Sequence, residues 1–177
     1  MESLNKHYPY YLRWQQREGL VWWLDRPEPA RESLWVDDLN RVPLFATHQQ
    51  LNFFVLGFGA YLERQENPPV DLDAVAAWVA GAAELRVEEC LRAWNLFDDL
   101  RAGVQKPFLG NKHNPKRNRV FDLLYAGSGL LPNSAVDVPW RMNGPIEWQP
   151  GELDTLRYIL TQGLELWRQC THWQPEA

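Results

Sequence analysis

The sequence predicts one α+β domain over residues 1–177, in which an N-terminal antiparallel β-meander packs against a C-terminal set of α-helices. Three observations carry this prediction. The 177 residues are 45% hydrophobic, which is enough for one sizeable core and short for two. Residues 1–46 contain short segments rich in Tyr, Trp and Val, which are typical of strands. From residue 47 to residue 177 the apolar side chains recur mainly at helical spacing.

Four strands are expected in the N-terminal quarter, at residues 10–15, 19–25, 33–37 and 42–46. Breaker residues at 17–19 and 27–30 separate the first three. The connection 38–41 contains Asp and Asn and is short enough for a hairpin. Because side chains alternate along a strand, the adjacent Trp22 and Trp23 should face opposite sides of the sheet.

The first helix is expected to begin after Thr47 and to end near Gln65. Thr47 and Gln50 form a capping-box pattern, and the apolar residues that follow recur at helical spacing. Apolar residues also occupy its other side, at Phe53, Leu56 and Ala60, so we expect this helix to be covered on two faces.

Further helices are expected at residues 71–80, 87–104 and 119–125, and from Pro150 onward, where a proline suits the first turn. Residues 106–119 contain five Lys or Arg, no acidic residue and two prolines, and we expect an exposed, irregular basic loop there. Residues 127–144 should form an irregular crossing.

One ion pair is expected between two helices. Asp98 falls on the apolar stripe of helix 87–104, and Arg157 has the same position in the last helix. A charge on a buried stripe needs a partner, so we hypothesise that the two side chains pair across packed helices.

The charge pattern is acidic outside the basic loop. The chain has 18 Lys and Arg against 23 Asp and Glu, and the five basic residues of 106–119 leave 13 against 23 elsewhere. This balance disfavours nucleic acid and anionic membranes as direct partners. Carboxylates on solvated faces are the ordinary explanation, and an acidic surface for a basic protein partner is the functional one.

Motifs for catalysis, cofactors or metals are absent from the sequence, so we expect no cofactor, no metal and no enzyme activity. The two cysteines, Cys90 and Cys170, suit neither a disulfide framework nor a metal site. Neither a signal peptide nor an apolar run of membrane-spanning length is visible. These features favour a cytoplasmic protein.

Several segments resemble a group of small stand-alone bacterial proteins found in polymorphic-toxin loci. The resemblance rests on residues 91–100 (LRAWNLFDDL), 120–125 (VFDLLY) and 130–132 (LLP), followed by the closing amphipathic helix. It implies an immunity protein of the contact-dependent growth inhibition type, which binds one cognate toxin domain in the cytoplasm and covers its active site.

An acidic, aromatic-rich surface suits this role, because such toxins are commonly nucleases with basic clefts. The partner-binding residues that we predict are six carboxylates, Asp37, Asp38, Asp71, Asp73, Glu88 and Asp99, and two aromatic anchors, Trp23 and Trp35. Two alternatives stay open: a small enzyme with a helix-lined pocket around Asp98, and a homodimer formed through the tryptophan-rich sheet.

Overall fold

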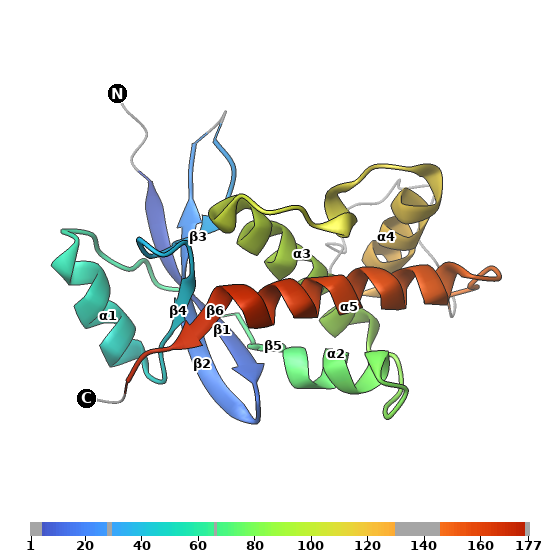
Figure 1. Cartoon of the computed structure of the whole chain (residues 1–177), viewed down its shortest axis with the longest axis horizontal. Coiled ribbons are helices and arrows are strands. Elements are labelled where there is room, and N and C mark those ends of the chain that lie inside the picture. The colour runs from blue at the N-terminus through green and yellow to red at the C-terminus, as the bar shows by residue number, and fades with distance from the viewer. Residues whose placement is uncertain (1–4, 28–29, 66, 130–145, 176–177) are drawn as a thin grey trace.

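The computed structural model describes residues 5–27, 30–65, 67–129 and 146–175, and it confirms the α+β fold (Figure 1). A four-stranded sheet has the order β3-β2-β1-β5. Its strands are β1 (Lys6–Trp14), β2 (Arg17–Asp25), β3 (Ser33–Leu34) and β5 (Val70–Asp71). The first three pair antiparallel in chain order, and β5 adds to β1 in parallel.

The turn between β1 and β2 lies at Gln15 and Gln16, just before the breakers that the sequence indicated at 17–19. Both residues have positive φ, 56° and 60°, as the two central residues of a type I′ hairpin turn require. Neither is glycine, so the conformation is costly for them. The carboxylate of Asp73 stabilises this turn, because it accepts hydrogen bonds from the backbone N–H groups of Gln15 and Gln16, at 2.8 and 2.7 Å.

The fourth strand, β4 (Val42–Leu44), does not extend the meander through a hairpin with β3. It pairs in parallel with β6 (Thr171–Trp173) from the end of the chain. Phe45 then bridges to Leu20 of β2 through two backbone hydrogen bonds of 2.9 Å. The C-terminal strand β6 therefore pairs with β4, in place of the hairpin with β3 that the sequence predicted.

Both faces of the β1–β2 ribbon are covered. Trp22 lies in a small apolar cluster with Leu20, Leu24, Phe45, Leu51 and Val55. Trp23 packs on the other side against the main core, to which the helices α2, α3 and α5 contribute. The prediction that these two tryptophans face opposite sides is thus confirmed.

Helix α1 (His48–Gly57) covers the first of these faces. Thr47 caps it as predicted, because its hydroxyl oxygen accepts a hydrogen bond from the N–H of Gln50 at 3.2 Å. The helix ends eight residues earlier than predicted, where Gly59 takes a left-handed conformation with φ of 73°.

The prediction that α1 is covered on two faces is wrong. Leu51 and Val55 are fully buried, whereas Phe53 is 80% exposed and Leu56 is 43% exposed. The sheet is contacted by one side of the helix, and nothing in the described part of the chain covers the other.

The main core lies among the longer helices, in which α5 crosses the molecule beside α2, α3 and α4 (Figure 1). Their bounds are α2 (Leu72–Val79), α3 (Val87–Val104), α4 (Pro115–Gly127) and α5 (Glu152–Cys170). No helix in the described ranges combines the length and the apolar composition needed to cross a membrane. The expected irregular crossing at 127–144, residues 130–132 of the resemblance included, lies largely outside the described residues.

The basic segment 106–119 is more ordered than expected. Phe108 is buried in the core, a short 3₁₀ turn spans Leu109–Asn111, and α4 begins at Pro115. The guanidinium of Arg117 lies 5.0 Å from the ring centres of both Trp94 and Phe121. Aromatic contacts therefore hold part of a segment whose charge alone suggested a solvated loop.

The predicted ion pair between Asp98 and Arg157 is wrong. Asp98 pairs with Arg101 at 2.9 Å within α3, and Arg157 pairs with Asp154 at 3.4 Å within α5. The Arg157 guanidinium also lies 5.0 Å from the centre of a Trp78 ring. Each charge has its partner three residues away in the same helix, a spacing at which side chains on a helix surface meet.

The contact between α5 and α3 at Gly163 leads to a stability prediction. A Cβ at Gly163 would overlap the ring of Phe97, which is fully buried, whereas a Cβ at Gly57 of α1 would meet open space. We expect Gly163→Ala to lower the free energy of unfolding by about 1–3 kcal/mol, measured by urea denaturation. Gly57→Ala should leave it unchanged or slightly raised. Equal loss in both variants would contradict this packing.

Candidate functional site

The fold distributes the eight predicted partner-binding residues over four places. Asp71 ends β5 and caps α2, whereas Asp73 and Glu88 lie in the first turns of α2 and α3. Asp37 and Asp38 lie in the turn before β4. Trp23 and Asp99 contact each other across β2 and α3, and Trp35 belongs to the aromatic cluster beneath α1.

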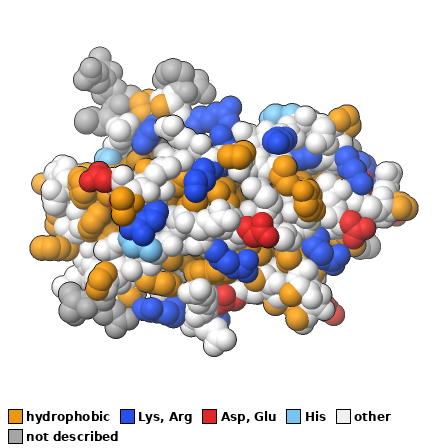
Figure 2. Space-filling view, viewed as in Figure 1, with side chains coloured by type: hydrophobic (Ala, Val, Ile, Leu, Met, Phe, Trp, Pro, Cys, Tyr) orange, Lys and Arg blue, Asp and Glu red, His pale blue; other side chains and the backbone are white. Residues whose placement is uncertain are grey.

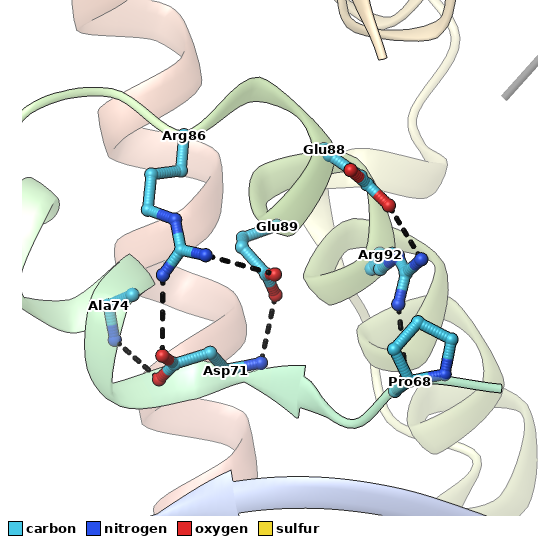
Figure 3. A network of polar contacts seen from close by, with 7 residues as sticks. All are labelled: Pro68, Asp71, Ala74, Arg86, Glu88, Glu89 and Arg92. Carbon is cyan, nitrogen blue, oxygen red and sulfur yellow. Dashed lines mark hydrogen bonds and ion pairs between the residues drawn. The ribbon is translucent and has the colours of Figure 1, made fainter. Parts of the chain in front are cut away.

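Asp71 and Glu88 of the first group lie in two adjacent sets of ion pairs, Asp71–Arg86–Glu89 and Glu88–Arg92 (Figure 3). We call these five residues together the α2–α3 charge network. Arg86 lies between two carboxylates, 3.4 Å from Asp71 and 3.6 Å from Glu89. A carboxylate oxygen of Glu89 also accepts the backbone N–H of Asp71 at 2.9 Å. These contacts join the start of α2 to the first turn of α3.

Local sequence explains why the carboxylates sit there. Asp71 is the N-cap of α2, and its side chain accepts the N–H of Ala74 at 2.9 Å. Glu88 and Glu89 occupy the first turn of α3, where negative charge complements the helix dipole. Helix capping therefore collects acidic groups from two segments at one place on the surface.

Arg92 holds the outer part of the network. It donates to Glu88 at 2.6 Å and to the carbonyl oxygen of Pro68 at 3.0 Å, and its side chain is only 16% exposed (Figure 3). Glu88 is 48% exposed. An accessible carboxylate is thus fixed by a shielded guanidinium that is itself fixed by the backbone.

A hollow of about 210 Å³ adjoins Arg92. It is lined by side chains of β1 and of the segment before β5, chiefly Tyr10, Tyr11, Pro9, Gln65 and Pro68. Asp73 lies nearby on α2, pairs with Arg13 at 3.8 Å and holds the β1–β2 turn. The surface beside the network is therefore aromatic and polar. Asp71 and Asp73 both stabilise local structure, Asp71 at the start of α2 and Asp73 at the β1–β2 turn.

Asp99 has the most perturbed acid–base chemistry among the described carboxylates. The indole N–H of Trp23 donates to it at 3.0 Å. The pKa of Asp99 is raised to about 7, mainly by burial and also by the charges of Glu32 and Asp98, whereas the hydrogen bond from Trp23 and the charge of Arg101 act to lower it. An open hollow of about 500 Å³ lies beside it, lined by Asp25, Glu32, Asp98 and three arginines among others. The enzyme alternative requires titratable groups around a pocket, and among the described residues this hollow is the place that fits that requirement.

The other predicted residues serve local structure. One carboxylate oxygen of Asp37 accepts the N–H groups of Leu39 and Arg41, which closes the turn before β4, whereas Asp38 is exposed. Trp35 is partly buried and stacks on Trp22, with ring centres 5.3 Å apart. Trp23 is likewise partly buried between Tyr8 and Asp99.

Sequence reasoning missed the exposed aromatic side of α1. The signal was present, because residues 42–62 contain aromatic side chains and no Asp, Glu, Lys or Arg. Apolar residues on both sides of the helix suggested burial on both, and the distinction depends on how many elements surround it. Within the described ranges, no group of three or more His, Cys, Asp or Glu side chains is arranged to hold a metal ion.

No family model and no curated protein matches this chain. Among solved structures, it is similar to the crystal structure of the C-terminal domain of SatS in complex with bromine. The two share 9% sequence identity over 95% of this chain and 94% of that one, with a TM-score of 0.49. A likeness of this degree carries no functional argument.

The buried carboxyl of Asp99 leads to a prediction about pH. Because its folded-state pKa of about 7 exceeds the ordinary value of 3.8, its contribution to stability is present below pH 4 and is lost as the pH rises to about 7. The Asp99→Asn variant should therefore gain stability relative to the native chain between pH 4 and pH 8, by about 2–4 kcal/mol. Urea unfolding of both proteins across this range measures the difference, and a constant difference would contradict the assignment.

Proposed function

We propose that this protein is an immunity protein, which binds a cognate bacterial toxin domain of the nuclease type and neutralises it. The observation that carries the proposal is the α2–α3 charge network. The fold brings Asp71, Glu88 and Glu89 from two segments to one surface, where Arg86 and Arg92 hold them in fixed positions. Together with the resemblance in residues 91–100 and 120–125, this favours an acidic binding surface.

The chemistry of such a surface suits a basic cleft. Carboxylate oxygens can accept hydrogen bonds from the Lys and Arg side chains that would otherwise bind phosphate. Glu88 is held at 2.6 Å by Arg92, so little side-chain entropy remains to be lost when a partner binds. The acidic loop residue Glu84, which is exposed, adds charge beside the network.

This proposal does not use Trp23 and Trp35, the aromatic anchors predicted from the sequence, as partner contacts. Trp23 and Trp35 pack against neighbours inside the fold, so in this proposal they support the structure. Tyr10 and Tyr11, which line the hollow beside Arg92, are the aromatic residues next to the network. Partner contacts from the hollow would thus involve tyrosine, whose ring and hydroxyl both suit interfaces.

The proposal predicts that the gene next to this chain's gene encodes a secreted protein with a toxic C-terminal domain, and it is tested with that domain. We expect production of that domain to arrest growth and co-production of this chain to restore it. The purified proteins should form a one-to-one complex. A neighbouring product without toxicity, or toxicity that this chain does not relieve, would overturn the proposal.

The role of the network is tested by association kinetics. The double variant Glu84→Gln/Glu88→Gln removes two exposed carboxylates while keeping side-chain size, so we expect its association rate at 50 mM salt to fall by about 3–10-fold. Asp122→Asn removes one exposed carboxylate from α4 and should have little effect. Association should also slow with added salt for the native chain, and stopped-flow fluorescence measures all of these rates. Equal effects of the two variants would place the binding surface elsewhere.

A further inference from the structure

The outer side of α1 has the two shapes that a self-complementary contact needs. Phe53 projects from it with 80% of its surface exposed. Directly beside it lies an open hollow of about 810 Å³, lined by residues at the start of the helix and along its outer side: Ala46, Thr47, Gln49, Gln50, Asn52, Phe53 and Leu56. A projection and a hollow thus belong to the same small patch.

The composition of the patch follows the usual plan of an interface. Phe53 and Leu56 are three residues apart and share one side of the helix, with Ala46 at its start. Amide side chains of Gln49, Gln50 and Asn52 surround them. An apolar centre with an uncharged polar rim is typical of the buried part of protein–protein contacts.

The charge of this patch indicates which kind of partner it can bind. Residues 42–62 contain no Asp, Glu, Lys or Arg, whereas the whole chain has a net charge of -5. Helices that lie on membranes and surfaces that bind nucleic acid use Lys and Arg, which are lacking here. A neutral patch is also where two copies of an acidic protein can approach with the least repulsion. Hydrophobic side chains are prominent at the α1 end of the molecule (Figure 2).

We propose that this side of α1 binds a second copy of the chain, forming a two-fold symmetric dimer. In such a contact the same patch is used twice, so Phe53 of each copy enters the hollow beside α1 of the other. The amides of the rim then hydrogen-bond reciprocally across the two-fold axis. Because the patch is about one short helix long, roughly 15 Å, the dimer should be weak, with a dissociation constant on the order of 10 μM.

This dimer is separate from the proposed function. Helices α1 and α2 lie on opposite sides of the β1–β2 ribbon (Figure 1), so a partner on the α2–α3 charge network and a second copy on α1 can bind together. The expected assembly with a toxin domain is therefore two copies of each protein. Dimer formation is measured on the isolated chain and does not depend on any toxin.

Sedimentation equilibrium between 2 and 200 μM tests the proposal. We expect the average mass to rise from 20.7 kDa toward twice that value as the concentration increases. Phe53→Ser and Leu56→Gln should each weaken the dimer by tenfold or more. Tyr158→Ser, which removes a ring that is 68% exposed on α5, is the matched control and should sediment like the native chain.

Cross-linking supplies a second measurement. The two native cysteines are each only 1% exposed, so a cysteine introduced at the surface is the reactive one. Asn52→Cys should form a disulfide-linked dimer under mild oxidation, and Tyr158→Cys should not. A chain that remains monomeric at 200 μM, or a dimer that Phe53→Ser leaves intact, would overturn the proposal. Adsorption to phosphatidylcholine vesicles that depends on Phe53, without a dimer, would overturn it in favour of a membrane surface.

Discussion

The structure depends on burying both faces of one antiparallel ribbon. Along β2, Leu20, Trp22 and Leu24 enter one apolar cluster, whereas Val21 and Trp23 face the main core. A ribbon with large apolar side chains on each face must be covered twice, because two strands alone bury too little surface to be stable. This requirement places α1 on one side of the strands and α2, α3 and α5 on the other.

The two coverings are unequal, and the surface chemistry follows from that. On the main side several helices pack together, and their first turns bring acidic caps and arginines into the α2–α3 charge network. On the other side a single helix meets the ribbon, and its far side stays in solvent with Phe53 exposed. The charged surface and the neutral aromatic surface are thus consequences of how many elements cover each face.

Much of the fold could be predicted from local patterns. The β1–β2 strands, the Thr47 cap, helix 87–104 and the closing helix depend on alternation, helical spacing and capping, which act within a few residues. The pairing of β4 with β6 could not, because it joins residues near 43 to residues near 172. The Asp98–Arg157 hypothesis failed for the opposite reason: each residue pairs with an opposite charge three positions away in its own helix, Arg101 or Asp154, and this local spacing was visible in the sequence.

The candidate sites show the same division. Acidic residues in first turns could be recognised in the sequence, and the contact between Asp71 and Arg86 could not, since it depends on how α2 packs against α3. Likewise Asp99 was an ordinary carboxylate in the sequence, and its pKa of about 7 comes from burial beside Trp23.

By itself, the sequence determined the fold class, most element positions, the acidic balance and the neutral character of residues 42–62, because composition and periodicity are properties of the chain alone. Tertiary structure alone decided which side of α1 is buried, which arginine pairs with each carboxylate and which carboxyl group is buried away from solvent. Those outcomes depend on neighbours that are distant in sequence, and burial and charge pairing are set by all of the neighbours together.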